Sequence, residues 1–151
     1  MIQLVSPTDF SDVSENALKY AIGLQRVFGE ELAIVHFYQR VRATGHFISM
    51  RDILQEDSER EMQQLVKSLE GSLPEKKQIR LKVAEGEVPE MLRGMVKGDR
   101  LHLIVMGSNG ASKIKNIFGS TAKAVINQVL TPTLIIPPGC EYKKYEHMVV
   151  A

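Results

Sequence analysis

The run LHLIVMGSNGASKIKNIFGSTAKA, residues 101 to 124, joins a buried strand, a glycine loop and the start of a helix. Leu103 to Met106 are apolar without alternation, which is typical of a parallel strand covered on both faces. Small residues follow at Gly107 to Gly110, and residues 119 to 121, GST, stand where the next helix is expected to begin. Glycine tolerates positive φ, and the amides of a helix N-terminus attract anions. The run therefore predicts a phosphate site, with a purely structural turn as the alternative.

Familiar nucleotide motifs do not match this run. A P-loop requires G-x-x-x-x-G-K-[ST], and the dinucleotide fingerprint requires G-x-G-x-x-G. The glycines at 107, 110 and 119 fit neither spacing. An ATP pyrophosphatase would need a serine- and glycine-rich loop after the first strand, and SPTDFS, residues 6 to 11, has no glycine.

The composition is that of an ordinary globular domain. The 151 residues are 44% hydrophobic and 25% charged, with a formal net charge of +1, so one domain with a real core is expected. The sequence has neither the basic patch of a nucleic-acid binder nor an apolar segment long enough to span a bilayer. It begins without a signal peptide, and its single cysteine, Cys140, fits a reducing compartment. We therefore expect a cytoplasmic protein without nucleic-acid or membrane partners.

Strands and helices alternate along the chain. Apolar runs predict five strands, over residues 1–6, 32–38, 79–83, 103–106 and 133–136. Helical spacing predicts four helices, over residues 11–28, about twenty residues ending before Gly71, residues 88–97 and residues 120–130. The polar stretch 39–50 is expected to be an irregular connection. Because each crossover is right-handed and holds a helix, we expect an α/β fold, a five-stranded parallel sheet with helices on both faces.

Ligands of such sheets bind at the carboxyl ends of the strands, beside the first strand. The first strand ends in Pro7, Thr8 and Asp9, and the fourth ends in the glycine loop, so a carboxylate acceptor is expected opposite phosphate donors. The alternative for Asp9 is a helix cap or a turn residue beside Ser11. His36, inside the second strand, is predicted to be a satisfied core residue and not a ligand.

At this point the chain resembles the universal stress protein family over nearly its whole length. The likeness lies in VSPTDFSDVSENAL, IVHFY, EGEVPEML, LIVMGSNG and IFGSTAKAVINQVLTPTLIIP, five segments in the family's order. The resemblance implies strand order 3-2-1-4-5 and a Rossmann-like, adenine nucleotide alpha hydrolase-like fold. The nucleotide-binding branch of the family has G-x-x-G, nine residues, then G-[ST]. Here the residues between the two parts, Ala111 to Phe118, number eight.

The resemblance also implies a nucleotide site, carried over position by position. Asp9 and the backbone of Phe37 would neighbour adenine and ribose, with Pro7 and Thr8 shaping that wall. Met106 and Gly107 would line the base of the pocket, and Asn109 stands where the family often has histidine. The groups expected to meet the phosphates belong to Gly110, Gly119, Ser120 and Thr121. Lys113 and Lys115 are interpreted as solvated loop residues.

The resemblance implies a regulatory function that depends on ATP. Binding of ATP, alone or with Mg²⁺, would change the shape or the assembly of the protein. No nucleophile motif is visible, and the four histidines lack metal-ligand spacing, so no catalytic set is predicted. Slow ATP hydrolysis is one alternative, because a bound Mg²⁺ polarises phosphate. The other is a protein-interaction module of the same fold that binds no nucleotide, to which the eight-residue spacing would assign the chain.

The fifth strand, residues 133–136, is expected at a sheet edge, and prolines at 132 and 137 bound it. An apolar edge without lysine favours a homodimer through this strand, as the resemblance also implies. The alternative is a monomer whose edge is covered by Met148, Val149 and Val150. We expect residues 1–138 to form the domain and residues 139–151 a C-terminal tail.

Overall fold

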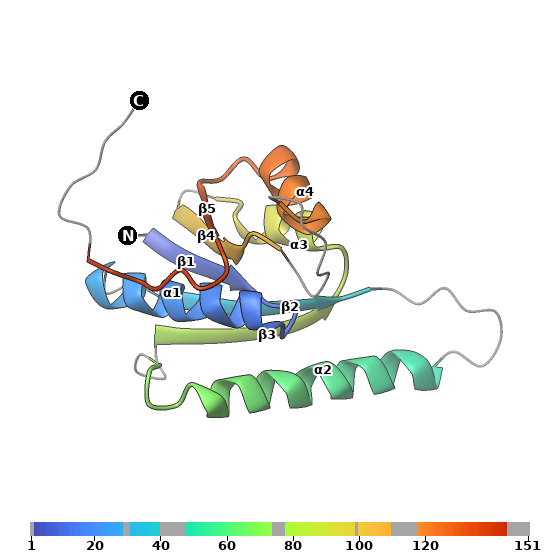
Figure 1. The fold of residues 1–151 in the computed structure, drawn as a ribbon. Coiled ribbons are helices and arrows are strands. Elements are labelled where there is room, and N and C mark those ends of the chain that lie inside the picture. Colours follow the sequence, from blue (N-terminus) through green and yellow to red (C-terminus); the bar gives the residue numbers. More distant parts are fainter. Residues whose placement is uncertain are drawn as a thin grey trace.

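We describe the protein from a computed structural model, for residues 2–28, 31–39, 48–73, 78–98, 100–109 and 118–144. Strands and helices alternate as expected (Figure 1). In chain order they are β1 (Ile2–Pro7), α1 (Asp12–Phe28), β2 (Leu32–Tyr38), α2 (Ile48–Ser68), β3 (Ile79–Glu85), α3 (Val88–Met95), β4 (Leu101–Gly107), α4 (Ser120–Gln128) and β5 (Thr133–Ile136).

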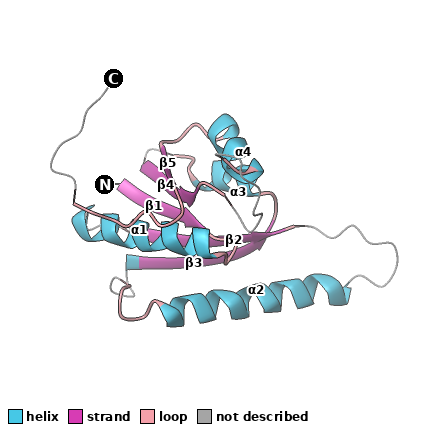
Figure 2. Cartoon of the chain, viewed as in Figure 1, coloured by secondary structure: helices cyan, strands magenta, loops and turns pink. Residues whose placement is uncertain are grey.

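The strands form one parallel sheet in the order β3-β2-β1-β4-β5 (Figure 2). This confirms the predicted α/β class and strand order. In the register, Leu4 of β1 lies opposite Leu32 of β2, and Val5 lies opposite Ile104 of β4. Because the strands are parallel, the turns after β1 and β4 meet at one end of the sheet.

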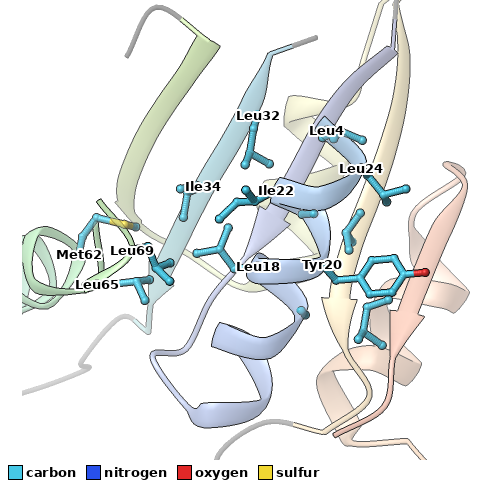
Figure 3. Packing of buried hydrophobic residues seen from close by; sticks show 14 residues of the cluster. Leu4, Leu18, Tyr20, Ile22, Leu24, Leu32, Ile34, Met62, Leu65 and Leu69 are labelled. Atoms are coloured by element: carbon cyan, nitrogen blue, oxygen red, sulfur yellow. The ribbon is translucent and has the colours of Figure 1, made fainter. Parts of the chain in front are cut away.

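The sheet has a separate hydrophobic core on each face. Neighbouring residues on a strand point to opposite faces, so Leu4 and Val5 enter different cores. On the first face, α1 and α2 cover β2, with Leu18 of α1 and Met62 of α2 near Ile34 (Figure 3). On the other face, α3 and α4 contribute the fully buried Leu92 and Val125. The central strands are thus buried on both sides, as their apolar runs predicted.

Several element bounds differ from the predictions. Helix α2 begins at Ile48, inside the stretch that we expected to be irregular, while residues 40–47 lie outside the described ranges. Helix α4 ends at Gln128 because Val129 is already extended, and Leu130 is therefore fully exposed at 101%. Along α4 the buried residues are Ala122 and Val125. On β3, Leu81 is 46% exposed, because this edge strand is covered less than the centre of the sheet.

The described part of the C-terminal tail runs along α1 (Figure 1). Asn16 donates through Nδ2 to the carbonyl oxygens of Pro137 and Cys140, each at 3.2 Å. The Tyr142 ring meets Tyr20 edge-on, with centroids 5.3 Å apart, and lies over Gly23, where a Cβ would come within 2.4 Å of it. Pro137, Cys140 and Tyr142 therefore contact α1. Met148 to Val150 lie outside the described residues.

No helix in the part of the chain that the structure describes is long and apolar enough to cross a membrane.

Candidate functional site

A cavity of about 100 Å³ opens at the carboxyl ends of β1, β2 and β4. Two helix starts, those of α3 and α4, also border it. The lining residues are Pro7, Thr8, Asp9, Ser14, Phe37, Val88, Met106, Gly107, Asn109, Thr121 and Ala122. This is the end of a parallel sheet at which ligands usually bind.

One wall of the cavity is the turn between β1 and α1. The Asp9 carboxylate accepts the Ser11 amide at 3.2 Å and the Ser11 hydroxyl at 2.5 Å through Oδ1. Aspartate side chains often stabilise turns in this way, by accepting a hydrogen bond from the backbone amide two residues later. Asp9 is also exposed and borders the cavity. The predicted turn role is therefore present, together with a position at the cavity.

Two buried hydroxyl groups, those of Thr8 and Ser14, also stabilise this turn. The Ser14 hydroxyl donates to the Ser11 carbonyl at 2.9 Å, so its oxygen is left to accept from the Thr8 hydroxyl at 3.0 Å. Thr8 Oγ1 in turn accepts the Phe10 amide at 3.0 Å. Thr8 and Ser14 are 6% and 5% exposed, which makes this a buried and mutually satisfied pair. The turn therefore has a defined conformation before any ligand arrives.

His36 is half-buried on β2, and its Nδ1 lies 2.8 Å from the Thr8 carbonyl oxygen. It has the hydrogen-bond partner that the core interpretation predicted, and it does not line the cavity.

The opposite wall begins at the end of β4, and here Gly107 differs from our expectation. Among the described residues, positive φ occurs at Phe10, Gly86, Gly98 and Gly139, and not at Gly107. A Cβ on Gly107 would lie 2.8 Å from Val13 Cγ1 and 3.1 Å from the Val13 carbonyl oxygen. This glycine is thus required for the close approach of β4 to α1, in addition to lining the cavity.

Backbone hydrogen bonds tie this wall to β5 and α4. The Ser108 amide donates to the Ile136 carbonyl at 2.9 Å, and the Gly119 amide donates to the Ser108 carbonyl at 2.7 Å. The Gly119 N–H, which we expected to meet a phosphate, is therefore engaged within the protein. The first helical bond of α4 runs from Lys123 N to Gly119 O, at 3.1 Å. The amides of residues 120–122 precede this bond and are the ones that a helix N-terminus leaves for other acceptors.

Asn109 stands between these two parts of the wall. Its Oδ1 is buried and has no hydrogen-bond partner among the described residues. A buried acceptor without a donor costs free energy, and native proteins contain few of them. A ligand group with an N–H or O–H would supply the missing donor.

Apolar side chains complete the cavity. Phe37 and Met106 are 7% and 5% exposed, and Val88 is half-buried. A groove of about 520 Å³ adjoins the cavity and shares Phe37, Val88 and Thr121 with it. Its other polar lining residues are Gln39, Glu87, Glu90, Arg93, Ser120 and Gln128.

The predicted site residues are thus only partly brought together. Ser120 borders the adjoining groove and not the smaller cavity, whereas Thr121 borders both. Gly110, Lys113 and Lys115 lie outside the described residues. Ser14 and Val88 border the cavity although we did not predict them. The signal for Val88 was available, because it begins the helix that follows β3 at the same end of the sheet.

Within the described ranges, no group of three or more His, Cys, Asp or Glu residues is arranged to hold a metal ion.

Comparison with known proteins shows extensive similarity to one family. Residues 3–137 match the universal stress protein family. Universal stress protein MJ0531 of Methanocaldococcus jannaschii is 26% identical over 140 residues, covering 89% of this chain and 81% of that protein.

Solved structures share the fold. A universal stress protein in complex with cAMP has a TM-score of 0.65 and 19% identity, covering 91% of this chain and 97% of that one. A universal stress protein from Archaeoglobus fulgidus in complex with dAMP has a TM-score of 0.55 and 21% identity, covering 89% of this chain and 94% of that one.

Proposed function

This chain belongs to the universal stress protein family, and we propose that it is a regulatory protein that binds an adenine nucleotide, ATP, in the cavity beside Asp9. The observation that carries the proposal is the distribution of polar groups around that cavity. Acceptors lie at Asp9 and at the buried Asn109 Oδ1, while the first turn of α4 supplies donors near Thr121. A nucleotide has hydroxyl and amino donors at one end and anionic oxygens at the other.

The nucleoside would lie against the β1 and β2 side. The apolar surfaces of Phe37, Val88 and Met106 offer an adenine ring a place to be buried. The Asp9 carboxylate is suited to ribose hydroxyls, because a charged acceptor makes stronger hydrogen bonds than a neutral one. Asn109 Oδ1 would accept a further hydrogen bond.

The phosphates would lie at the start of α4. Its first-turn amides and helix dipole favour anions, and the Ser120 and Thr121 hydroxyls add donors. Mg²⁺ would enter with ATP, bound to the phosphate oxygens and neutralising part of their charge. The adjoining groove gives the chain of phosphates room beyond the smaller cavity.

Two solved relatives of this fold are complexes with the adenine nucleotides cAMP and dAMP. They support the choice of nucleotide class for this chain. We assign a regulatory role, in which occupancy alters shape or assembly, and no catalytic residue.

The alternative is an interaction module that binds no nucleotide. One observation favours it, namely that the Gly119 amide already donates to Ser108 and so is withdrawn from a phosphate.

The protein is further proposed to form a homodimer through β5. This strand is at the sheet edge, and two apolar residues that precede it in the chain, Ile126 on α4 and Leu130 after α4, are 48% and 101% exposed. An apolar edge of this kind favours pairing with a second copy. In light scattering, Ile135→Lys should convert the dimer to monomer, whereas Val27→Lys, an exposed apolar site at the end of α1, should not. A monomeric wild-type protein, or a dimer insensitive to Ile135→Lys, would contradict the proposal.

The direct test of nucleotide binding is calorimetry with MgATP, AMP and adenosine, together with analysis of nucleotide released from the purified protein by denaturation. Saturable binding of ATP is expected. Flat titrations at millimolar nucleotide, with no nucleotide released, would favour the interaction module.

A further inference from the structure

Phe10, directly after Asp9, has a backbone conformation that its side chain disfavours. Its φ is 60°, in the left-handed region, and it is the sole non-glycine residue there among the described residues. An L-residue in this region incurs a free-energy cost from its Cβ, so surrounding contacts must hold it in place.

His36 makes two contacts, one with Phe10 and one with Thr8, two positions earlier. Its ring lies against the Phe10 ring, with centroids 4.3 Å apart and planes inclined by 34°. Its Nδ1 lies 2.8 Å from the carbonyl oxygen of Thr8. One side chain on β2 thus contacts the residues immediately before and after Asp9.

The contact with Thr8 determines the form of the imidazole. A carbonyl oxygen only accepts hydrogen bonds, so Nδ1 must carry the proton. In the neutral ring, Nε2 is then the unprotonated nitrogen. This form keeps the Thr8 carbonyl bound to β2 while the Thr8 amide donates to the Val35 carbonyl at 2.8 Å.

We propose that His36 is a positioning residue, which sets the conformation of the turn that presents Asp9 to the cavity. It acts by binding the Thr8 carbonyl and by supporting Phe10 in its left-handed conformation, without touching the ligand. The consequence for affinity rests on the proposed nucleotide binding, but the conformation of the turn does not.

The first test needs no nucleotide. In the wild-type protein, ¹⁵N NMR of the imidazole should show a protonated, pyrrole-like Nδ1 and a pyridine-like Nε2 for neutral His36. Solvent exchange of the Phe10 and Ser11 amides should be faster in His36→Phe, which keeps a ring but loses the donor. A proton on Nε2, or equal exchange rates in the two proteins, would overturn the proposal.

A second pair of variants separates the donor from the ring. In His36→Asn, the side-chain amide stands close to the place of Nδ1 and keeps a donor for Thr8, so it should restore slower exchange than in His36→Phe. Phe10→Gly removes the strain, so the turn should need less support, and adding His36→Phe to it should change the exchange of the Ser11 amide less than in the wild-type background. If His36→Asn exchanges like His36→Phe, or if Phe10→Gly leaves the effect of His36→Phe undiminished, the proposal fails. Circular dichroism would verify that each variant is folded.

The third test links the turn to the ligand. His36→Phe should weaken adenosine binding roughly tenfold, the loss of one hydrogen bond's contribution. In an Asp9→Ala background the same change should cost little, because the group being positioned is gone. Equal losses in both backgrounds would overturn positioning of Asp9. If the wild-type protein bound no nucleotide, the proposed function would fall, and the first two tests would still decide whether His36 sets the turn.

Discussion

The turn after β1 and the segment after β4 border the same cavity, but they use their polar groups differently. In the β1 turn, the Thr8 and Ser14 hydroxyls and the Asp9 Oδ1 atom have partners within the turn. On the β4 side, the Gly119 amide donates to the Ser108 carbonyl, whereas Asn109 Oδ1 is buried and finds no hydrogen-bond partner in the described part of the chain. The β1 turn is therefore ordered before a ligand binds, whereas the segment after β4 has an acceptor, Asn109 Oδ1, that a ligand can use. A ligand would find one rigid surface and one that gains a hydrogen bond on binding.

The largest expected effect is on stability and concerns the β4 wall. Gly107→Ala would place Cβ 2.8 Å from Val13 Cγ1 and 3.1 Å from a backbone oxygen that cannot move freely. We expect the free energy of unfolding to fall by about 1–3 kcal/mol, as for other overpacked sites, measured by urea denaturation.

Gly94→Ala on α3 is the matched control, because nothing lies within 4 Å of its Cβ position. It should stabilise the protein by about 0.5–1 kcal/mol, the usual helix preference for alanine. Equal effects of the two substitutions would show that Gly107 is not needed for packing.

The next effect is on affinity and concerns the β1 wall. Asp9→Ala should weaken adenosine and ATP by similar factors, of about tenfold or more, because a charged acceptor is lost from the nucleoside side. Asp12→Ala removes the same charge from an exposed position on α1 and should leave calorimetric affinity unchanged. Unchanged affinity in Asp9→Ala would show that the carboxylate acts only in the structure of the turn.

A smaller effect is expected at the start of α4. Thr121→Val keeps the shape of the side chain but removes its hydroxyl, so AMP and ATP should bind several-fold more weakly, by about 1 kcal/mol. Adenosine lacks a phosphate and serves as the internal control, with affinity nearly unchanged. If adenosine lost as much affinity as AMP, the phosphates would not lie at α4.

The smallest effect tests the unmet acceptor. Asn109→Leu removes a buried oxygen that accepts no hydrogen bond from the residues that the structure describes, so the free energy of unfolding should stay within about 1 kcal/mol of the wild-type value or rise. Nucleotide affinity should nevertheless fall. Asn127→Leu, exposed on α4, is the control for affinity. A clear loss of stability in Asn109→Leu would show that the amide has a structural role.

Much of the fold could be predicted from the sequence, because its signals are local. The bounds predicted from the apolar runs match those of β2, Leu32–Tyr38, and β5, Thr133–Ile136. The alternation of strands and helices requires a parallel sheet, and the family resemblance supplied the strand order. The end of α4 was placed two residues late, since the extended Val129 continues the apolar pattern of the helix.

The site was less predictable, because its details depend on contacts between distant segments. Asp9 and Asn109 were placed near each other by the rule that parallel strands end together. However, a glycine is needed at position 107 because Val13 of α1 packs against it, and the Gly119 amide donates to the Ser108 carbonyl. Neither contact is visible in the sequence. The left-handed φ of Phe10 and the His36 ring that lies against it likewise become visible only in the structure.

The most direct test of nucleotide binding at this cavity is a ¹H–¹⁵N NMR titration of the wild-type protein with MgATP. Saturable shifts are expected for the amides of Thr8, Asp9, Phe37, Asn109 and Thr121, which border the cavity, with little change at Val27 and Phe28 at the far end of α1. Absence of shifts at millimolar MgATP, or shifts confined to residues away from the cavity, would contradict the account.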